Sequence, residues 1–426
     1  MVIIFIKNGQ IYTQPLQYIL SVFSRSMQCG IAFINEKSIA DLVFDHTDTM
    51  SNPVNVDFYE GLISKRHFRH DFHFNGNPIL RFTQSNQPDW LGTAFYMVNA
   101  FQEYADESTD NQFDQHGRFK YEATYQCKYD CMEDNLVQKC FEKFCEEHSI
   151  LKEFARKNRQ SKVFISHDID TINGSFLQDG LWALKNRRPG LIMKLIMNEI
   201  LLKPDWKNME RIAKLHDEHD LKDTFFWLAT RKIASNGVKN ADYNIQRLSK
   251  MLQKLPSKGL HKSCYYTTIN EELDMLPFDT KLNRYHFLKI TLPETWDALD
   301  ESRITLDASL GFAERYGFRN SYGLPFRPYN LRLGRARNFI EVPLNVMDGT
   351  LHRYMKVPLN LTATKIIDFL EKNKTNAIIS ILWHNTYFTN YKYAGYLQEY
   401  KKVLLYLNET RIESITPGEI AREYGS

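Results

Sequence analysis

From Ser161 to the end of this 426-residue chain, short apolar segments alternate with amphipathic ones, and this alternation restricts the fold more than any other feature. The apolar segments, such as "KVFIS", "TFFWLA" and "NAIISILWH", have the length and composition of buried strands. The segments between them, such as "WKNMERIAKLHDEH" and "TATKIIDFLEKN", repeat apolar residues with a helical period. Strands that alternate with helices predict right-handed βαβ units around a mainly parallel sheet. About seven such strands favour a deformed (β/α) barrel over a short open sheet.

Residues 1–158 have a less regular pattern, which predicts a separate unit. The first segment, "MVIIFIKNGQIYTQ", predicts a strand, and "WLGTAFYMVNAFQEY" and "CFEKFCEEHSILKEFARKNRQ" predict helices. The chain is long enough for two domains with sizeable cores. We therefore expect a smaller α/β accessory domain at 1–158, followed by the (β/α) barrel domain at 159–426.

Charge and hydropathy argue against several classes of protein. The 54 basic and 51 acidic residues leave a net charge of +3, which offers no argument for a nucleic-acid or anionic-membrane partner. The longest apolar stretch, "LIMKLIMNEILL" at 191–202, is interrupted by charged and polar residues, so no membrane span is expected. The N-terminal apolar run is too short for a signal peptide. We expect a cytoplasmic protein whose oligomeric state the sequence does not indicate.

Four polar clusters, "HDID", "GLH", "LDAS" and "LWHN", each stand at the carboxyl end of a predicted strand, the face where such folds place their sites. In an extended segment Asp168 and Asp170 leave the same face, with Cα atoms about 6.5 to 7 Å apart. One carboxylate can hold a metal ion while the other takes a proton from water. On this pair alone, a loop cap or an arginine partner explains the aspartates equally well. His261 and His384 on the same rim favour the metal site, because imidazole serves both as a ligand and as a general acid.

Five segments in this order and spacing, "SHDID", "GLH", "NRYHFL", "LDASLGFAERYGFRNSYGLPFRPYN" and "LWHNTYF", resemble the bacterial polysaccharide deacetylase-like proteins related to carbohydrate esterase family 4. Upstream, "LGTAFYMVNAFQEY" and "DQHGRF" resemble the N-terminal domain that accompanies this branch. The resemblance implies a deformed (β/α) barrel with one divalent metal ion, usually Zn²⁺. It also implies removal of N- or O-linked acetyl groups from a carbohydrate, such as a bacterial surface-polysaccharide precursor or a related glycan.

The resemblance also implies roles for individual residues. Asp168 corresponds to the catalytic base and Asp170 to a metal ligand. His261 corresponds to a second metal ligand, and His384 to the general acid that protonates the departing sugar nitrogen or oxygen. Arg284, in "NRYHFL", stands at the position of the arginine that orients the base.

The third metal ligand is where the chain departs from the family. The second motif normally has two histidines four residues apart, but Tyr265 stands at that distance after His261. His286 and Cys264 are candidate replacements, whereas alternation along the strand predicts that His167 faces away. We favour His286. Weak or lost metal binding is the remaining alternative.

A further set of residues resembles the family's groove-forming segment or flanks His384, and is predicted to contact substrate: Asp307, Arg319, Arg327, Trp383 and Tyr387. For the charged members, an internal ion pair that braces a long loop is an equally good interpretation. For the aromatic members, core packing is the alternative.

The sequence therefore predicts a metal-dependent hydrolase that removes acetyl or similar small acyl groups from a carbohydrate. Two alternatives stay open. The first is a catalytically silent carbohydrate-binding protein on the same barrel. The second is a hydrolase of a non-sugar amide, because fold and motifs do not determine the substrate.

Overall fold

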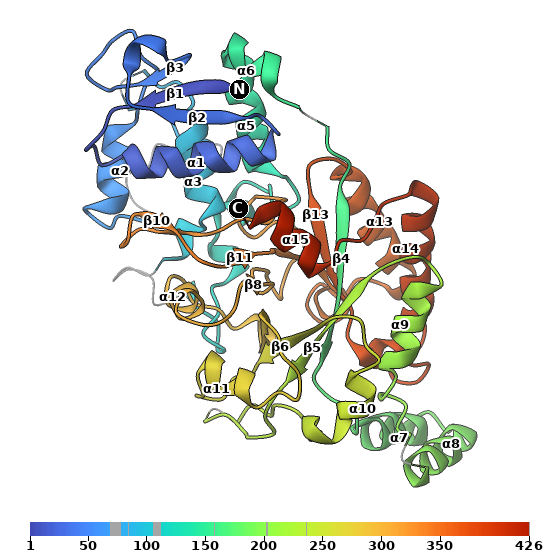
Figure 1. Ribbon diagram of the computed structural model, residues 1–426. Helices are drawn as coiled ribbons and strands as arrows, with labels where there is room; N and C mark the ends of the chain where they lie inside the picture. The colour runs from blue at the N-terminus through green and yellow to red at the C-terminus, as the bar shows by residue number, and fades with distance from the viewer. Residues whose placement is uncertain are drawn as a thin grey trace.

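The computed structural model describes residues 1–68, 78–83, 85–104, 112–156, 158–201, 203–235 and 237–425. Its largest element is an eight-stranded sheet with the order β11-β8-β7-β6-β5-β4-β13-β12, in which every described pair of neighbours is parallel (Figure 1). The strands are β4 (Lys162–Ile169), β5 (Asp223–Leu228), β6 (Lys258–Lys262), β7 (Leu282–Tyr285), β8 (Leu306–Asp307), β11 (Ile340–Glu341), β12 (Leu344–Met347) and β13 (Ile378–Leu382).

The two edges of this sheet are joined by a single extended segment. β11 pairs with β8 at one edge and β12 pairs with β13 at the other, yet only Val342 and Pro343 separate β11 from β12 in the chain. Pro343 has no backbone N–H to donate, which accounts for the break between the two short strands. The sheet is therefore curled into a barrel-like α/β fold, as the alternating pattern predicts, with eight strands where about seven are expected.

Helices connect the strands and lie around the sheet (Figure 1). They are α9 (Met209–Asp217), α10 (Ser249–Leu252), α11 (Ile269–Asp274), α12 (Glu294–Asp300), α13 (Thr362–Lys372), α14 (Tyr396–Thr410) and α15 (Pro417–Tyr424). Two more helices, α7 (Ser175–Lys185) and α8 (Pro189–Ile200), form a hairpin that projects from the body at the lower right of Figure 1.

The N-terminal part has its own small parallel sheet, with the order β2-β1-β3. Its strands are β1 (Val2–Ile6), β2 (Ile31–Ile34) and β3 (Leu42–Phe44). Its helices are α1 (Thr13–Ser26), α2 (Val56–Ile63), α3 (Trp90–Val98), α4 (Tyr125–Lys128), α5 (Leu136–Glu147) and α6 (Ser149–Phe154). This part is thus α/β, as the sequence predicts.

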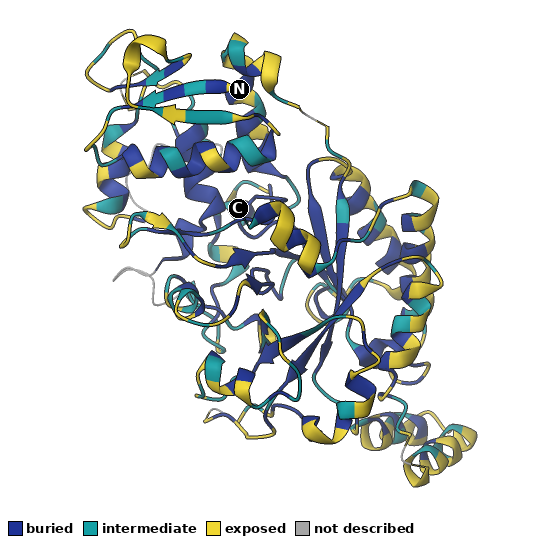
Figure 2. Cartoon of the chain, viewed as in Figure 1, coloured by how far each residue is buried: buried dark blue, intermediate teal, exposed yellow. Residues whose placement is uncertain are grey.

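The N-terminal part and the barrel-like part pack closely against each other. One hydrophobic core cluster runs through both (Figure 2). Between them lies a buried ion pair, in which Arg319 donates from Nη2 to Glu103 Oε2 over 2.6 Å and from Nε to Glu103 Oε1 over 2.9 Å. A short ribbon of β9 (Tyr329–Asn330) and β10 (Arg335–Ala336) adds a contact with α1. The domain boundary near residue 158 stays a prediction.

No described helix combines the length and the apolar character that crossing a bilayer requires.

Candidate active site

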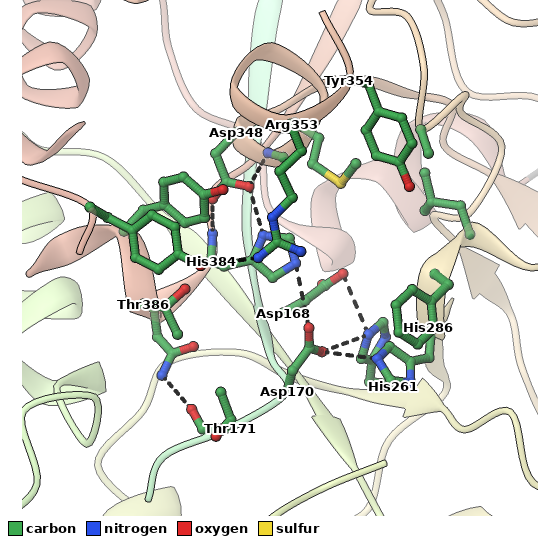
Figure 3. A pocket seen from close by; sticks show the side chains of 18 of the residues that line it. Asp168, Asp170, Thr171, His261, His286, Asp348, Arg353, Tyr354, His384 and Thr386 are labelled. Atoms are coloured by element: carbon green, nitrogen blue, oxygen red, sulfur yellow. Dashed lines mark hydrogen bonds and ion pairs between the residues drawn. The ribbon is translucent and has the colours of Figure 1, made fainter. Parts of the chain in front are cut away.

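The carboxyl ends of the barrel strands surround a cavity of about 160 Å³, which we call the site cavity (Figure 3). Parallel strands end at the same rim, so residues distant in the chain meet there. Six of the residues predicted from the sequence line it: Asp168, Asp170, His261, His286, His384 and Tyr387.

Three of these residues form a group that could hold a metal ion. The ligand atoms of Asp170, His261 and His286 all lie within 4.8 Å of one another, and we call these three residues the metal-capable group. Asp170 Oδ1 is 3.3 Å from His261 Nε2 and 3.6 Å from His286 Nε2. This oxygen is buried and has no hydrogen-bond partner among the described residues. Two imidazoles and one carboxylate suit Zn²⁺ or a similar divalent ion.

Hydrogen bonds on the far side of each ring orient the two histidines. His261 Nδ1 lies 2.9 Å from the backbone oxygen of Arg284, which can only accept, so this nitrogen carries the proton and Nε2 faces Asp170. His286 Nδ1 lies 3.3 Å from Asn240 Oδ1. Asn240 is absent from the sequence-based prediction, because it follows no predicted strand and belongs to no motif.

The charges in the metal-capable group shift one another's pKa values. Burial favours the protonated form of Asp170, but His286, His261 and His384 outweigh this effect and hold its pKa far below the usual range. Burial lowers the pKa of His286 to about 4, so this ring is neutral near pH 7, as a metal ligand must be. Burial also opposes protonation of His261, but the carboxylates of Asp168 and Asp170 raise its pKa overall.

Asp168 is anchored on one side only. Arg284 Nη1 donates to Asp168 Oδ1 over 3.0 Å and to Ser166 Oγ over 2.8 Å, and its Nε donates to the Ala308 backbone oxygen over 2.8 Å. The other carboxylate oxygen, Oδ2, lies 3.6 Å from His261 Nε2. One oxygen is thus fixed by a buried guanidinium, while the other faces the metal-capable group.

His384 stands on the opposite side of Asp170 from the two other histidines (Figure 3). Its Nε2 lies 3.7 Å from Asp170 Oδ2, and its Nδ1 lies 2.7 Å from Asp348 Oδ1. Burial lowers the pKa of His384, but the carboxylate of Asp348, with smaller contributions from Asp170 and Asp168, outweighs this effect and raises it to about 9. Asp348 is missing from the sequence-based prediction, although an aspartate directly after the apolar strand "LNVM" was a usable signal.

Three predicted substrate contacts lie away from the site cavity. Asp307 is buried and accepts a hydrogen bond of 2.6 Å from Asn283. Arg319 forms the internal ion pair with Glu103, which was the alternative interpretation. Arg327 donates to a backbone oxygen in the segment that follows β10. The structure places none of the three in the cavity lining, because the long loop after β8 packs inward against the rest of the protein.

Of the two aromatic neighbours of His384, one lines the site cavity and the other lies away from it. Tyr387 lines the site cavity, and its hydroxyl lies 2.8 Å from His352 Nδ1. Trp383 is fully buried and packs on Tyr400, with ring centroids 4.8 Å apart, so it lies in the core instead of the predicted substrate groove.

Cys264 and His167 lie outside the metal-capable group. The thiol of Cys264 lies 3.8 Å from the backbone oxygen of His286. His167 faces the other side of β4, as alternation predicts, where Nδ1 lies 2.6 Å from the Trp383 backbone oxygen. There it joins His216 and Asp223 in a second buried cluster, and His216 Nδ1 lies 2.8 Å from Asp223 Oδ2. These three residues do not line the site cavity.

The N-terminal part also contributes to the site cavity, which the sequence does not indicate. Arg118 lines it and donates from Nη1 to the backbone oxygen of Phe287 over 3.1 Å. Asp114 holds the same guanidinium with contacts of 2.7 Å to Nε and Nη2. Arg118 and Arg353, which follows β12, are thus two cationic residues at the wall of the cavity.

Comparisons with known proteins cover the chain unevenly. Residues 4–153 match the model of a family described as "Family of unknown function (DUF7033)". A search of curated proteins found no match. The chain is weakly similar to the solved structure titled "putative polysaccharide deacetylase" from Mycobacterium smegmatis, with 11% identity and a TM-score of 0.37, over 62% of this chain and 92% of that one. It is also weakly similar to a 4-alpha-glucanotransferase from Thermococcus litoralis, with 11% identity and a TM-score of 0.35, over 62% of this chain and 41% of that one. Similarity at this level establishes neither a shared fold nor a shared activity.

Proposed function

We propose that this protein is a metal-dependent hydrolase that removes acetyl groups from a carbohydrate, such as a bacterial surface-polysaccharide precursor or a related glycan. One observation carries the hydrolase part of the proposal. The metal-capable group converges on an unpartnered carboxylate oxygen, with Asp168 anchored by Arg284 on one side and His384 held by Asp348 on the other. The resemblance of the rim motifs to polysaccharide deacetylase-like proteins supports acetylated sugars as the substrate class.

The residues divide the chemistry between them. A divalent ion held by Asp170, His261 and His286, for which we propose Zn²⁺, would lower the pKa of water towards about 7 and polarise an acyl carbonyl. Asp168 takes the proton from the attacking water at Oδ2, because Arg284 occupies Oδ1. The buried carboxylate of Asp348 raises the pKa of His384, which favours the protonated ring, and this ring donates from Nε2 to the departing nitrogen or oxygen. Asp348 keeps that proton in place through Nδ1.

Metal content tests the proposal first. Purified protein would be incubated with Zn²⁺, desalted and measured by elemental analysis. We expect one Zn²⁺ per chain in the parent and in Cys264→Ser, and loss of the metal in Asp170→Asn, His261→Gln and His286→Gln. Cys264→Ser is the matched control because this thiol lies beside His286 but outside the metal-capable group. A parent protein that stays free of metal would contradict the proposal and favour a catalytically silent carbohydrate-binding protein.

Acetate release tests the substrate class. The zinc-loaded parent would be assayed with N-acetylated and O-acetylated oligosaccharides, and with acetylated amines that contain no sugar. We expect acetate from at least one of the two classes of oligosaccharide. Release from the sugar-free amides alone would retain the hydrolase but contradict the carbohydrate substrate.

A further inference from the structure

Much of the α7–α8 hairpin is exposed to solvent (Figure 2), and many of its exposed residues are large and apolar. Five of its large apolar side chains, Leu177, Leu181, Leu184, Met193 and Ile200, are each between 62% and 69% exposed. Phe176, Ile196, Met197 and Leu201 of the same hairpin are between 37% and 58% exposed, and we call these nine side chains the hairpin face. Exposed apolar side chains gathered on one projecting element are typical of an interaction site.

The spacing of these residues shows that each helix has one continuous exposed apolar face. On α7 they recur every three or four residues from Leu177 to Leu184, and on α8 they do so from Met193 to Ile200. The residues buried on the two helices are different ones, since Asp179 and Ala183 are buried on α7 and Leu195 is buried on α8. Packing of the hairpin therefore does not require the hairpin face.

The charged residues around the hairpin face have mainly one sign. Lys185, Arg187 and Arg188 at the tip are exposed, and no ion pair of these three residues with an acidic residue is found in the described part of the chain. Glu199 is the single exposed acidic side chain between residues 175 and 201. Lys194 lies over the ring of Tyr391, 5.5 Å from its centroid. The net charge of the whole chain is only +3, so this local excess is not visible in the composition.

We infer that the α7–α8 hairpin docks on the surface of an anionic phospholipid bilayer. Helices that lie at a membrane surface combine an apolar face with Lys and Arg side chains beside it, as this hairpin does. The apolar residues enter the boundary between headgroups and acyl chains, while the basic tip binds anionic headgroups. The positive charge of the tip favours an anionic bilayer over an apolar partner that carries no negative charge.

The hairpin also lies beside the candidate active site. Gln178 on α7 and Trp206, which follows α8, both line the site cavity. Docking therefore holds the cavity next to the bilayer surface. The assignment of a substrate rests on the proposed hydrolase function. If that function holds, the substrate is a glycan presented at a membrane surface.

Vesicle co-sedimentation of the full-length protein tests the docking without any need for activity. We expect binding to vesicles of phosphatidylcholine mixed with phosphatidylglycerol, weaker binding to pure phosphatidylcholine, and loss of binding as NaCl is raised. The double variant Leu181→Glu/Ile200→Glu should bind the mixed vesicles at least about a hundredfold more weakly, because two buried apolar contacts are lost. Leu405→Glu, at an exposed leucine on α14, is the matched control and should bind like the parent.

Charge reversal at the tip separates the electrostatic contribution to vesicle binding from the apolar contribution. The variant Arg187→Glu/Arg188→Glu should lose about tenfold or more of its binding to mixed vesicles and little of its binding to pure phosphatidylcholine. Circular dichroism would verify that each variant is folded. A parent that binds neither vesicle, or hairpin variants that bind as well as the parent, would overturn the inference. If sedimentation velocity instead shows self-association that Leu181→Glu/Ile200→Glu abolishes, the hairpin face joins two copies of the chain, and the membrane inference is wrong.

Discussion

At the scale of single residues, the two aspartates of "HDID" face the same cavity but have different partners. Arg284 anchors Asp168, whereas Asp170 lies among three imidazoles. We predict that Asp168→Asn retains bound Zn²⁺ but releases acetate about 10² to 10⁴ times more slowly, because the proton acceptor is lost. Metal analysis and acetate assays on the same preparation would check this split.

The matched variant for this test is Asp170→Asn, which should lose both the metal and the activity. An Asp168→Asn protein that loses its metal would show that Asp168 is also a ligand. Full activity in Asp168→Asn would contradict the role of Asp168 as the base.

The buried pair of His384 and Asp348 gives a prediction about pH. Because Asp348, with smaller contributions from Asp170 and Asp168, raises the pKa of His384 from 6.5 to about 9, the ring should be protonated at pH 7 and lose its proton only as the pH rises through about 9. Asp348→Asn removes this charge, so the midpoint should shift to lower pH. Histidine NMR titration of the metal-free protein would measure both midpoints.

Asp217→Asn, at an exposed position on α9, is the control for this titration and should leave the midpoint of His384 unchanged. A midpoint at or below 6.5 in the parent would contradict the effect assigned to Asp348.

At the scale of elements, the last helix shows how strongly a local signal can act. Thr416 accepts a hydrogen bond from the Glu419 backbone N–H over 3.2 Å, and Glu419 Oε2 accepts from the Thr416 backbone N–H over 2.7 Å, which together form a capping box. We predict that Thr416→Ala lowers the free energy of unfolding by about 1 kcal/mol, measured by urea denaturation.

A substitution at Gly418, inside α15, should change the free energy of unfolding in the opposite direction. A methyl group added at Gly418 meets no atom within 4 Å, so Gly418→Ala should raise the free energy of unfolding by a few tenths of a kcal/mol through better helix propensity. If the two variants change stability in the same direction, the local account of this helix start is wrong.

At the scale of the whole molecule, the ion pair between Glu103 and Arg319 joins the N-terminal part to the barrel-like part. Both side chains are 1% exposed. Glu103→Ala would leave the guanidinium buried without its counter-charge, so we predict a loss of about 3 to 5 kcal/mol in the free energy of unfolding, measured by urea denaturation.

The exposed pair of Arg303 and Asp274 provides the control, since Asp274→Ala should cost less than about 1 kcal/mol. Equal losses of unfolding free energy in Glu103→Ala and Asp274→Ala would mean that the pair of Glu103 and Arg319 adds no stability to the interface between the two parts.

The sequence by itself determined the features that depend on local backbone geometry. The periods of strands and helices predict the barrel-like α/β fold, because they depend only on the residues within each segment. The same alternation predicts that Asp168 and Asp170 leave one face of β4, with His167 on the other. Polar residues directly after strands predict that His261 and His384 meet at one rim.

Only the tertiary structure decided which distant side chains meet. Asn240 and Asp348 orient histidines that lie 46 and 36 residues away in the chain, and Arg118 reaches the site cavity from the N-terminal part. Arg319 resembles a groove residue in the sequence but turns inward to Glu103. The composition of "LIMKLIMNEIL" at 191–201 is mainly apolar, and only the packing of the hairpin shows that most of these residues face solvent. Contacts of this kind depend on how elements pack together, which no local periodicity specifies.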